Sequence, residues 1–145
     1  PGAQVVAQYF NFIHLGHAGY CQRMACLEAT ASYLADSIAA MAPMKLLSHP
    51  RGQLPVFAVT LEDSIDTWTV FQLSERLRSR GWQVPAYTMP AACEGLSVLR
   101  FVIRAGFTLD MADLLLRDLQ NAVDWFQQLS SPMPDPNPEH RPFHH

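Results

Sequence analysis

The stretch VLRFVIR at residues 98–104 alternates between two kinds of side chain with a period of two. One set is entirely apolar and consists of Leu99, Phe101 and Ile103. The other set carries both charges of the stretch and consists of Val98, Arg100, Val102 and Arg104. Because successive side chains of a strand point to opposite faces, this pattern predicts a strand with one face in a core and Arg100 on the other.

The surrounding sequence predicts the rest of a sheet. Residues 44–48 and 55–61 are short apolar runs, each typical of a strand, and a turn-like stretch from Pro50 to Gln53 separates them. Residues 82–88 are expected to be extended. Pro85 favours a place for them at the edge of the sheet, because proline donates no hydrogen bond to a neighbouring strand.

Three segments have the spacing of amphipathic helices. Residues 69–80 place apolar side chains on one face and end at Gly81, a typical helix stop. Residues 110–129 form an apolar stripe, with Asp110 as the expected N-terminal cap. Residues 3–41 predict one long helix or two helices with a bend, since glycines weaken their middle, and Pro43 ends them.

This order of elements predicts an α+β fold, in which helices cover one face of a small, mostly antiparallel sheet. The opposite face, with Arg100, is then free to pack against something else. We expect a linking helix or pair of helices at residues 1–42, an α+β domain at 43–130 and a proline-rich, flexible tail at 131–145.

Composition excludes several classes of protein. Of the 145 residues, 49% are hydrophobic and 16% charged, which is incompatible with a disordered chain. The net charge of −3 argues against a nucleic-acid partner, and no apolar run reaches the roughly 18 residues of a membrane span. The chain has three cysteines, which is a small and odd number and does not suit a disulfide framework. This favours a reducing compartment such as the cytoplasm.

Lysine and histidine are unevenly used. Lys45 is the single lysine, so any Schiff-base chemistry has one candidate in this chain. Six histidines could take the net charge from −3 to +3 in mild acid. His14, His17 and Cys21 have the spacing of one helix face and could bind zinc, but a fourth ligand is missing and we expect no metal.

Residue 1 is proline and leads directly into a helical pattern, without the features of a signal peptide. The simplest interpretation is that the chain begins inside a larger polypeptide.

The segment LSERLRSRGWQVPAYTM at residues 73–89 resembles the C-terminal region of pyridoxal-phosphate-dependent glutamate decarboxylases of the bacterial type. The segments GAQVVAQYFNF (2–12), VLRFVIRAGF (98–107) and LLLRDL (114–119) resemble the same family in order and spacing. The resemblance implies a fold-type-I enzyme, of which this chain is the small C-terminal domain and the helix leading into it. The lysine that binds pyridoxal phosphate is implied to lie on a missing large domain, and Lys45 does not match its sequence context.

The resemblance also implies roles for individual residues. Arg100 matches the small-domain arginine that binds the α-carboxylate of the substrate, whereas we expect Arg104 to be structural or solvent-facing. Phe143, His144 and His145 resemble the histidine-bearing C-terminus that blocks the active site of bacterial members at neutral pH. No catalytic or cofactor-binding residue is expected within this chain.

For the whole protein, the resemblance implies conversion of L-glutamate to 4-aminobutyrate and CO2 in acid resistance. It also implies a homodimer or higher homo-oligomer in the cytoplasm, with recruitment to a membrane at acid pH as one option.

Two alternatives remain open at this point. The chain could be a non-catalytic folding and dimerisation module, or an unrelated, free-standing α+β module for ligand binding or interaction. For the other prominent side chains we expect ordinary structural roles. We expect Arg76, Arg78 and Arg80 to form a solvated helix face or a subunit contact, and the Phe, Met and Trp residues at helical spacing to lie in the core.

Overall fold

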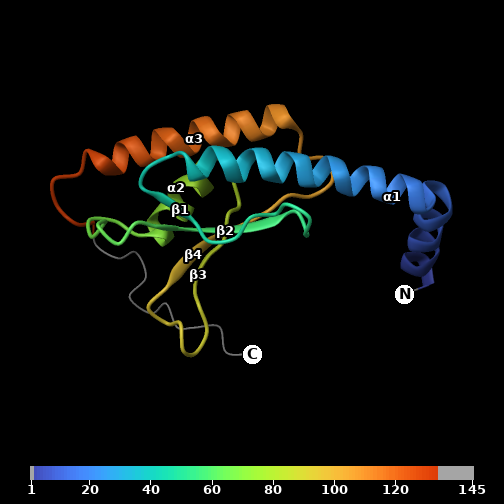
Figure 1. Cartoon of the computed structure of the whole chain (residues 1–145), viewed down its shortest axis with the longest axis horizontal. Coiled ribbons are helices and arrows are strands. Elements are labelled where there is room, and N and C mark those ends of the chain that lie inside the picture. The colour runs from blue at the N-terminus through green and yellow to red at the C-terminus, as the bar shows by residue number, and fades with distance from the viewer. Residues whose placement is uncertain (1, 134–145) are drawn as a thin grey trace.

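Four antiparallel strands form one sheet in the order β1-β2-β4-β3, as seen in the computed structural model, which describes residues 2–133 (Figure 1). The strands are β1 (Met44–Leu46), β2 (Val56–Leu61), β3 (Ala86–Thr88) and β4 (Ser97–Val102). The predicted strands are confirmed, and β3 lies at an edge of the sheet, where Pro85 favours it.

The two central strands, β2 and β4, form one side of the hydrophobic core. Phe57 on β2 and Phe101 on β4 are direct partners, and their rings stack with centroids 4.9 Å apart. The predicted alternation along β4 is confirmed, because Leu99, Phe101 and Ile103 are all buried and Arg100 is exposed. Except for Val98, which is 1% exposed on the Arg100 face, the fully buried apolar side chains of the strands lie on one face of the sheet.

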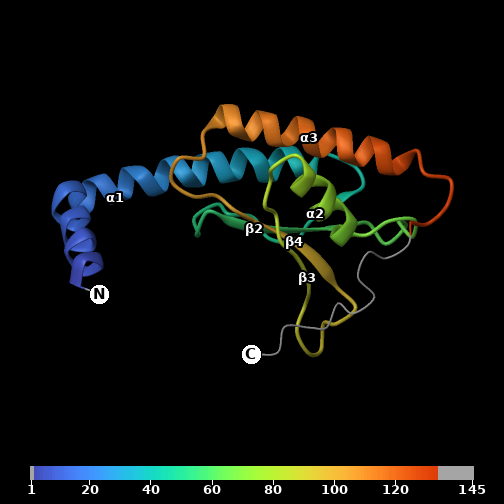
Figure 2. The ribbon, with the colours of Figure 1, turned by 180° about the vertical axis from the view of Figure 1, so that it is seen from behind.

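Three helices cover that face: α1 (Gly2–Ala39), α2 (Val70–Ser79) and α3 (Leu109–Gln127). Figures 1 and 2 show from opposite sides that α3 lies beside the second half of α1, with the sheet beneath them. A single cluster of buried residues joins the sheet to all three helices. The predicted α+β arrangement, with helices on one face, is therefore confirmed. None of these helices, over the residues described, is both long enough and apolar enough to cross a membrane.

Helix α3 begins two residues earlier than expected. Thr108, not Asp110, is the N-terminal cap, and its hydroxyl accepts a hydrogen bond from the amide of Met111. Asp110 lies in the first turn, where a carboxylate stabilises the positive end of the helix dipole. Helix α2 has a capping box between Thr69 and Gln72.

Arg76 and Arg80 contact α3, which corrects the expectation of a purely solvated face for these two, whereas Arg78 is exposed and pairs with Glu75 of the same helix. The Arg76 guanidinium lies 3.9 Å from the ring centroid of Trp125. Arg80 pairs with Asp118 at 3.0 Å, and the Trp82 indole donates a hydrogen bond to the same carboxylate at 2.8 Å. The Asp118 carboxylate therefore links α3 to the segment that connects α2 to β3.

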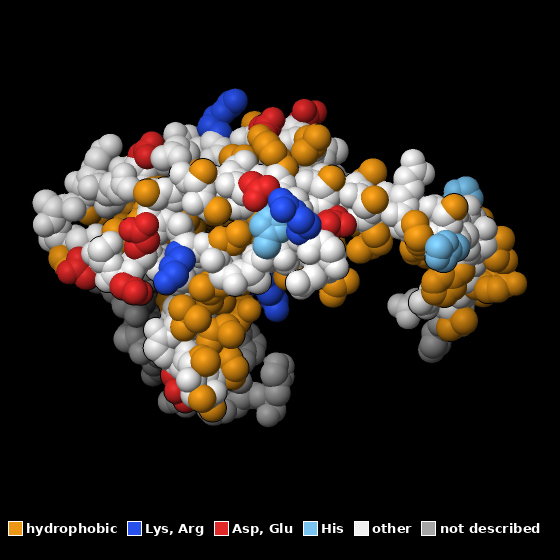
Figure 3. Space-filling view, in the orientation of Figure 1, with side chains coloured by type: hydrophobic (Ala, Val, Ile, Leu, Met, Phe, Trp, Pro, Cys, Tyr) orange, Lys and Arg blue, Asp and Glu red, His pale blue; other side chains and the backbone are white. Residues whose placement is uncertain are grey.

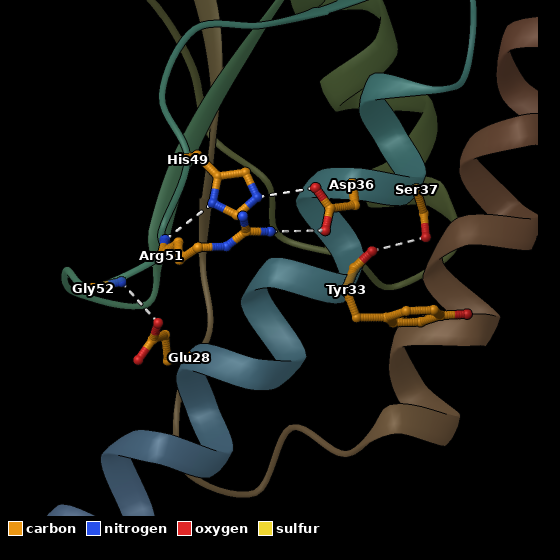
Figure 4. Close-up of polar contacts among 7 residues, drawn as sticks. All are labelled: Glu28, Tyr33, Asp36, Ser37, His49, Arg51 and Gly52. Atoms are coloured by element: carbon orange, nitrogen blue, oxygen red, sulfur yellow. Dashed lines mark hydrogen bonds and ion pairs between the residues drawn. The ribbon is translucent and has the colours of Figure 1, made fainter.

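A polar network holds the loop between β1 and β2 against α1 (Figure 4). His49 Nε2 lies 3.0 Å from Asp36 Oδ1, and His49 Nδ1 accepts a hydrogen bond from the amide of Arg51. The Glu28 carboxylate accepts a hydrogen bond of 2.7 Å from the amide of Gly52. Because these contacts are partly exposed, they contribute little to the free energy of unfolding. Their main effect is to hold the loop in place.

Helix α1 bends at Gly16, whose φ of 55° and ψ of −174° are not helical. The predicted bend is confirmed, and residues 2–15 form an arm that turns away from the rest of the molecule (Figure 1). The arm is the main exception to the expectation that Phe, Met and Trp residues at helical spacing lie in the core, since Phe10 is 61% exposed and Phe12 53%, and Tyr9 beside them is also exposed. Figure 3 shows the resulting hydrophobic surface.

The Asp118 contacts predict a pH-dependent contribution to stability. The hydrogen bond from Trp82 and the nearby Arg80 lower the pKa of Asp118, against the opposing effect of burial. A lowered pKa in the folded state stabilises the fold fully above the ordinary carboxyl pKa of about 4, and this contribution is lost as the pH falls below it. We expect Asp118→Asn to lower the melting temperature of the 145-residue chain at pH 7 by about 2–8 °C.

The difference between variant and parent should shrink as melts are recorded from pH 5 down to pH 2. Asp63→Asn, at an exposed carboxylate without a described partner, is the control and should melt like the parent throughout. A constant difference between Asp118→Asn and the parent at every pH would contradict this account.

Candidate functional site

Arg100 lies on β4, on the face of the sheet that the helices leave uncovered. Its direct partner on β2 is Ala58, and on the other side its amide donates a hydrogen bond of 3.0 Å to the carbonyl of Pro85. The neighbours across both strands are therefore small or apolar. They leave space around the guanidinium and offer it no polar side chain.

The strands carry an unbalanced set of charges. Their only charged residues are Lys45 and Arg100, and they contain no Asp or Glu. Within residues 2–133, no carboxylate pairs with Arg100, whereas Arg51, Arg78 and Arg80 each have an acidic partner. The described contact of the Arg100 guanidinium is with the ring of Tyr87, 5.4 Å from its centroid.

A groove borders this position. It runs between the segment 81–85, the end of β4 and the start of α3. Arg78, Arg100 and Arg104 line it together with apolar side chains, and none of the described residues that line it is acidic. Arg104 lies two residues beyond the end of β4 at Val102, which corrects the expectation that it shares a strand face with Arg100.

This arrangement suits the binding of an anion. A planar guanidinium can hold a carboxylate through two parallel hydrogen bonds, and a surface without acids does not compete for it. Arg100 was expected from the sequence, whereas Tyr87 beside it was not. Antiparallel pairing of residues 86–88 with the strand at 98–104 is the signal that would have found it.

Lys45 does not form a cofactor site with its neighbours. It is exposed on β1, at the edge of the sheet opposite to β3. The shallow pocket beside it is lined by Glu62 and Asp63, whose carboxylates would repel the phosphate of pyridoxal phosphate. The residues around this lysine therefore do not fit that cofactor.

The histidine-containing helix face is interrupted. The bend at Gly16 separates His14 from His17 and Cys21, so the spacing of one straight helix no longer applies. Cys21 Sγ lies 3.7 Å from His17 Nδ1. In the part of the chain that the structure describes, no group of three or more His, Cys, Asp or Glu residues could hold a metal ion. Phe143, His144 and His145 lie outside the described residues.

Comparisons with known proteins give a consistent result, although no family model matches the sequence. The chain is 41% identical over 128 residues to glutamate decarboxylase of Aliivibrio fischeri, covering 87% of this chain and 27% of the relative. It is 42% identical over 120 residues to glutamate decarboxylase of Solanum lycopersicum, covering 83% of this chain and 24% of the relative. The chain thus spans about a quarter of the length of these relatives.

Solved structures agree with the sequence matches. Lactobacillus brevis glutamate decarboxylase superposes with a TM-score of 0.81 at 35% identity, over 87% of this chain and 29% of that one. Tryptophan decarboxylase of Catharanthus roseus superposes with a TM-score of 0.69 over 82% of this chain and 25% of that one, and at 14% identity it supports the fold alone. The small-domain fold expected from the resemblance is confirmed. Sequence and structure together show that the chain is homologous to a C-terminal part of the glutamate decarboxylases.

Proposed function

We propose that this chain is the part of a glutamate decarboxylase that binds the α-carboxylate of L-glutamate, which the whole enzyme converts to 4-aminobutyrate and CO2. The observation that carries the proposal is the guanidinium of Arg100, which pairs with no carboxylate of residues 2–133 and lies on strands that contain no Asp or Glu. The names of the relatives support the substrate and the reaction.

Arg100 would act by holding the substrate carboxylate in one orientation. Two parallel hydrogen bonds from a guanidinium fix both the position and the plane of a carboxylate, which a lysine ammonium cannot do. A strand is a suitable support, because hydrogen bonds on both sides hold its backbone in place. Arg100 therefore contributes binding and orientation.

Pyridoxal phosphate would be held by a large domain outside these residues. We propose that this domain covers the face of the sheet with Arg100, where Val102 is 45% exposed. It would also contact the arm at residues 2–15. Residues 1–22 contain no Asp, Glu, Lys or Arg, so the arm is poorly suited to remain in water.

The division of the chain follows from this proposal. Residues 1–42 would link the two domains, although the second half of α1 is also part of the core through Leu34 and Ile38. Residues 43–130 would be the small domain, and residues 131–145 a regulatory tail.

The arm also supports a second candidate function. An exposed apolar helix is typical of an interface between subunits, and the chain could then serve in folding and assembly of a homodimer or larger homo-oligomer without a direct role in catalysis. The two candidates differ in what they require of Arg100, since an assembly module does not need a guanidinium at that position.

The first prediction concerns the cofactor. The 145-residue chain alone should bind no pyridoxal phosphate stoichiometrically and should release no CO2 from glutamate, because its single lysine lies beside Glu62 and Asp63. Absorbance after dialysis, followed by borohydride reduction and peptide mapping, measures this. A reduced adduct on Lys45 would contradict the prediction.

The second prediction concerns Arg100 in the full-length protein. Arg100→Ala should keep the fold and the bound cofactor but lower kcat/KM for glutamate about 30-fold or more, because a charged two-pronged contact contributes roughly 2–4 kcal/mol. Arg100→Lys should restore little of it. Arg104→Ala removes a guanidinium from the same groove and serves as the matched control. Near-normal turnover in both Arg100 variants would contradict substrate binding by Arg100 and would favour the second candidate function, assembly of an oligomer.

The third prediction concerns the tail. A neutral imidazole can enter an apolar active-site mouth, whereas an imidazolium is costly to desolvate there, so His144 and His145 would close the site near neutral pH and open it in acid. Phe143 would add apolar contact. Because the reaction consumes a proton, such control suits a role in acid resistance.

Deleting His144 and His145 from the full-length protein should extend activity toward neutral pH without raising the rate in acid. The pH profile of kcat measures this, with Phe143→Ala as a variant that should shift it less. If the truncated protein loses activity at the same pH as the parent, the tail is not the switch.

A further inference from the structure

We propose that Tyr87 is a positioning residue that holds the guanidinium of Arg100 for its carboxylate. This inference rests on the proposed role of Arg100 in substrate binding. The contact that points to it is the Tyr87 ring, whose centroid lies 5.4 Å from Arg100 Cζ. A cation within about 6 Å of an aromatic ring centroid is attracted by the ring.

Strand pairing places the two side chains together. In the antiparallel register of β3 and β4, Tyr87 is the direct partner of Val98, two residues before Arg100. Side chains two residues apart on a strand share a face, so Tyr87 and Arg100 are diagonal neighbours on the open face. The backbone of two hydrogen-bonded strands therefore fixes the distance between ring and guanidinium.

No other described side chain is seen to hold the guanidinium of Arg100 in place. The direct neighbours of Arg100, Ala58 and Pro85, offer the guanidinium no polar side chain, and no carboxylate within residues 2–133 pairs with it. An unsupported arginine side chain samples many rotamers, and each must be given up when the substrate binds. The ring of Tyr87 restricts that sampling beforehand and leaves the hydrogen-bond donors at the guanidinium edge available for a carboxylate.

The ring, and not the hydroxyl, is the active part of Tyr87. Within residues 2–133 the hydroxyl makes no hydrogen bond, and the side chain is half-buried. Phenylalanine should therefore replace tyrosine, whereas leucine should not, because it fills similar space without an aromatic face. This contrast separates a contact with the cation from simple packing.

Steady-state kinetics on the full-length, cofactor-loaded protein provides the test. We expect Tyr87→Phe to stay within about twofold of the parent in kcat/KM for glutamate, and Tyr87→Leu to lose about 5- to 10-fold, mainly through KM. The dissociation constant of glutarate, a dicarboxylate that does not react, should rise in parallel. Fluorinated phenylalanines at position 87 keep the ring shape while weakening its attraction for cations, so affinity should fall stepwise with fluorine content even if the leucine variant does not fold.

A double-mutant cycle with Arg100→Ala distinguishes the two proposals. If Tyr87 acts through Arg100, Tyr87→Leu should change kcat/KM less than twofold in the Arg100→Ala background. A full Tyr87→Leu loss in that background, or no effect of leucine and of fluorination in the parent, would overturn the inference on Tyr87. Arg100→Ala within twofold of the parent would instead overturn the proposed role of Arg100.

Discussion

Burial of one face of the β2–β4 pair beneath three helices is the constraint on which the rest of the structure depends. The stacked rings of Phe57 and Phe101 lie at its centre, and both side chains are almost fully buried. Side chains of a strand alternate between the two faces of the sheet. Placing these rings in the core therefore places the residues immediately before and after each of them on the opposite face. A shift by one residue would exchange Phe101 for Arg100, and the cost of burying an unpaired guanidinium excludes that register.

The composition of the opposite face follows from the same alternation. It carries Arg100 among small and apolar neighbours, with no acid in any of the four strands. Elsewhere in the described residues, Arg51, Arg78 and Arg80 pair with Asp or Glu, whereas no ion pair is described for Arg23 or Arg104. The guanidinium of Arg100 contacts an aromatic ring and lies on strands without acids, which supports a substrate anion as its partner.

Contacts between the helices determine the shape of the groove beside this face. Asp118 of α3 pairs with Arg80 and accepts a hydrogen bond from Trp82. These contacts hold the segment 81–85, which leads directly into β3, against α3. The same segment supplies Pro85, whose carbonyl accepts the hydrogen bond from Arg100. An electrostatic contact on the helical side of the molecule is thus connected through the backbone to the position of Arg100.

The sequence by itself determined the elements, the face of the sheet on which Arg100 lies, and the family. These depend on local periodicity and on long matching segments such as residues 73–89. It could not determine that Thr108 caps α3, that Arg76 and Arg80 contact α3, or that the aromatic residues of the arm are exposed. Tyr87 also became visible only through the pairing of β3 with β4. Each of these depends on residues brought together from distant parts of the chain, and only tertiary packing decides which of them meet.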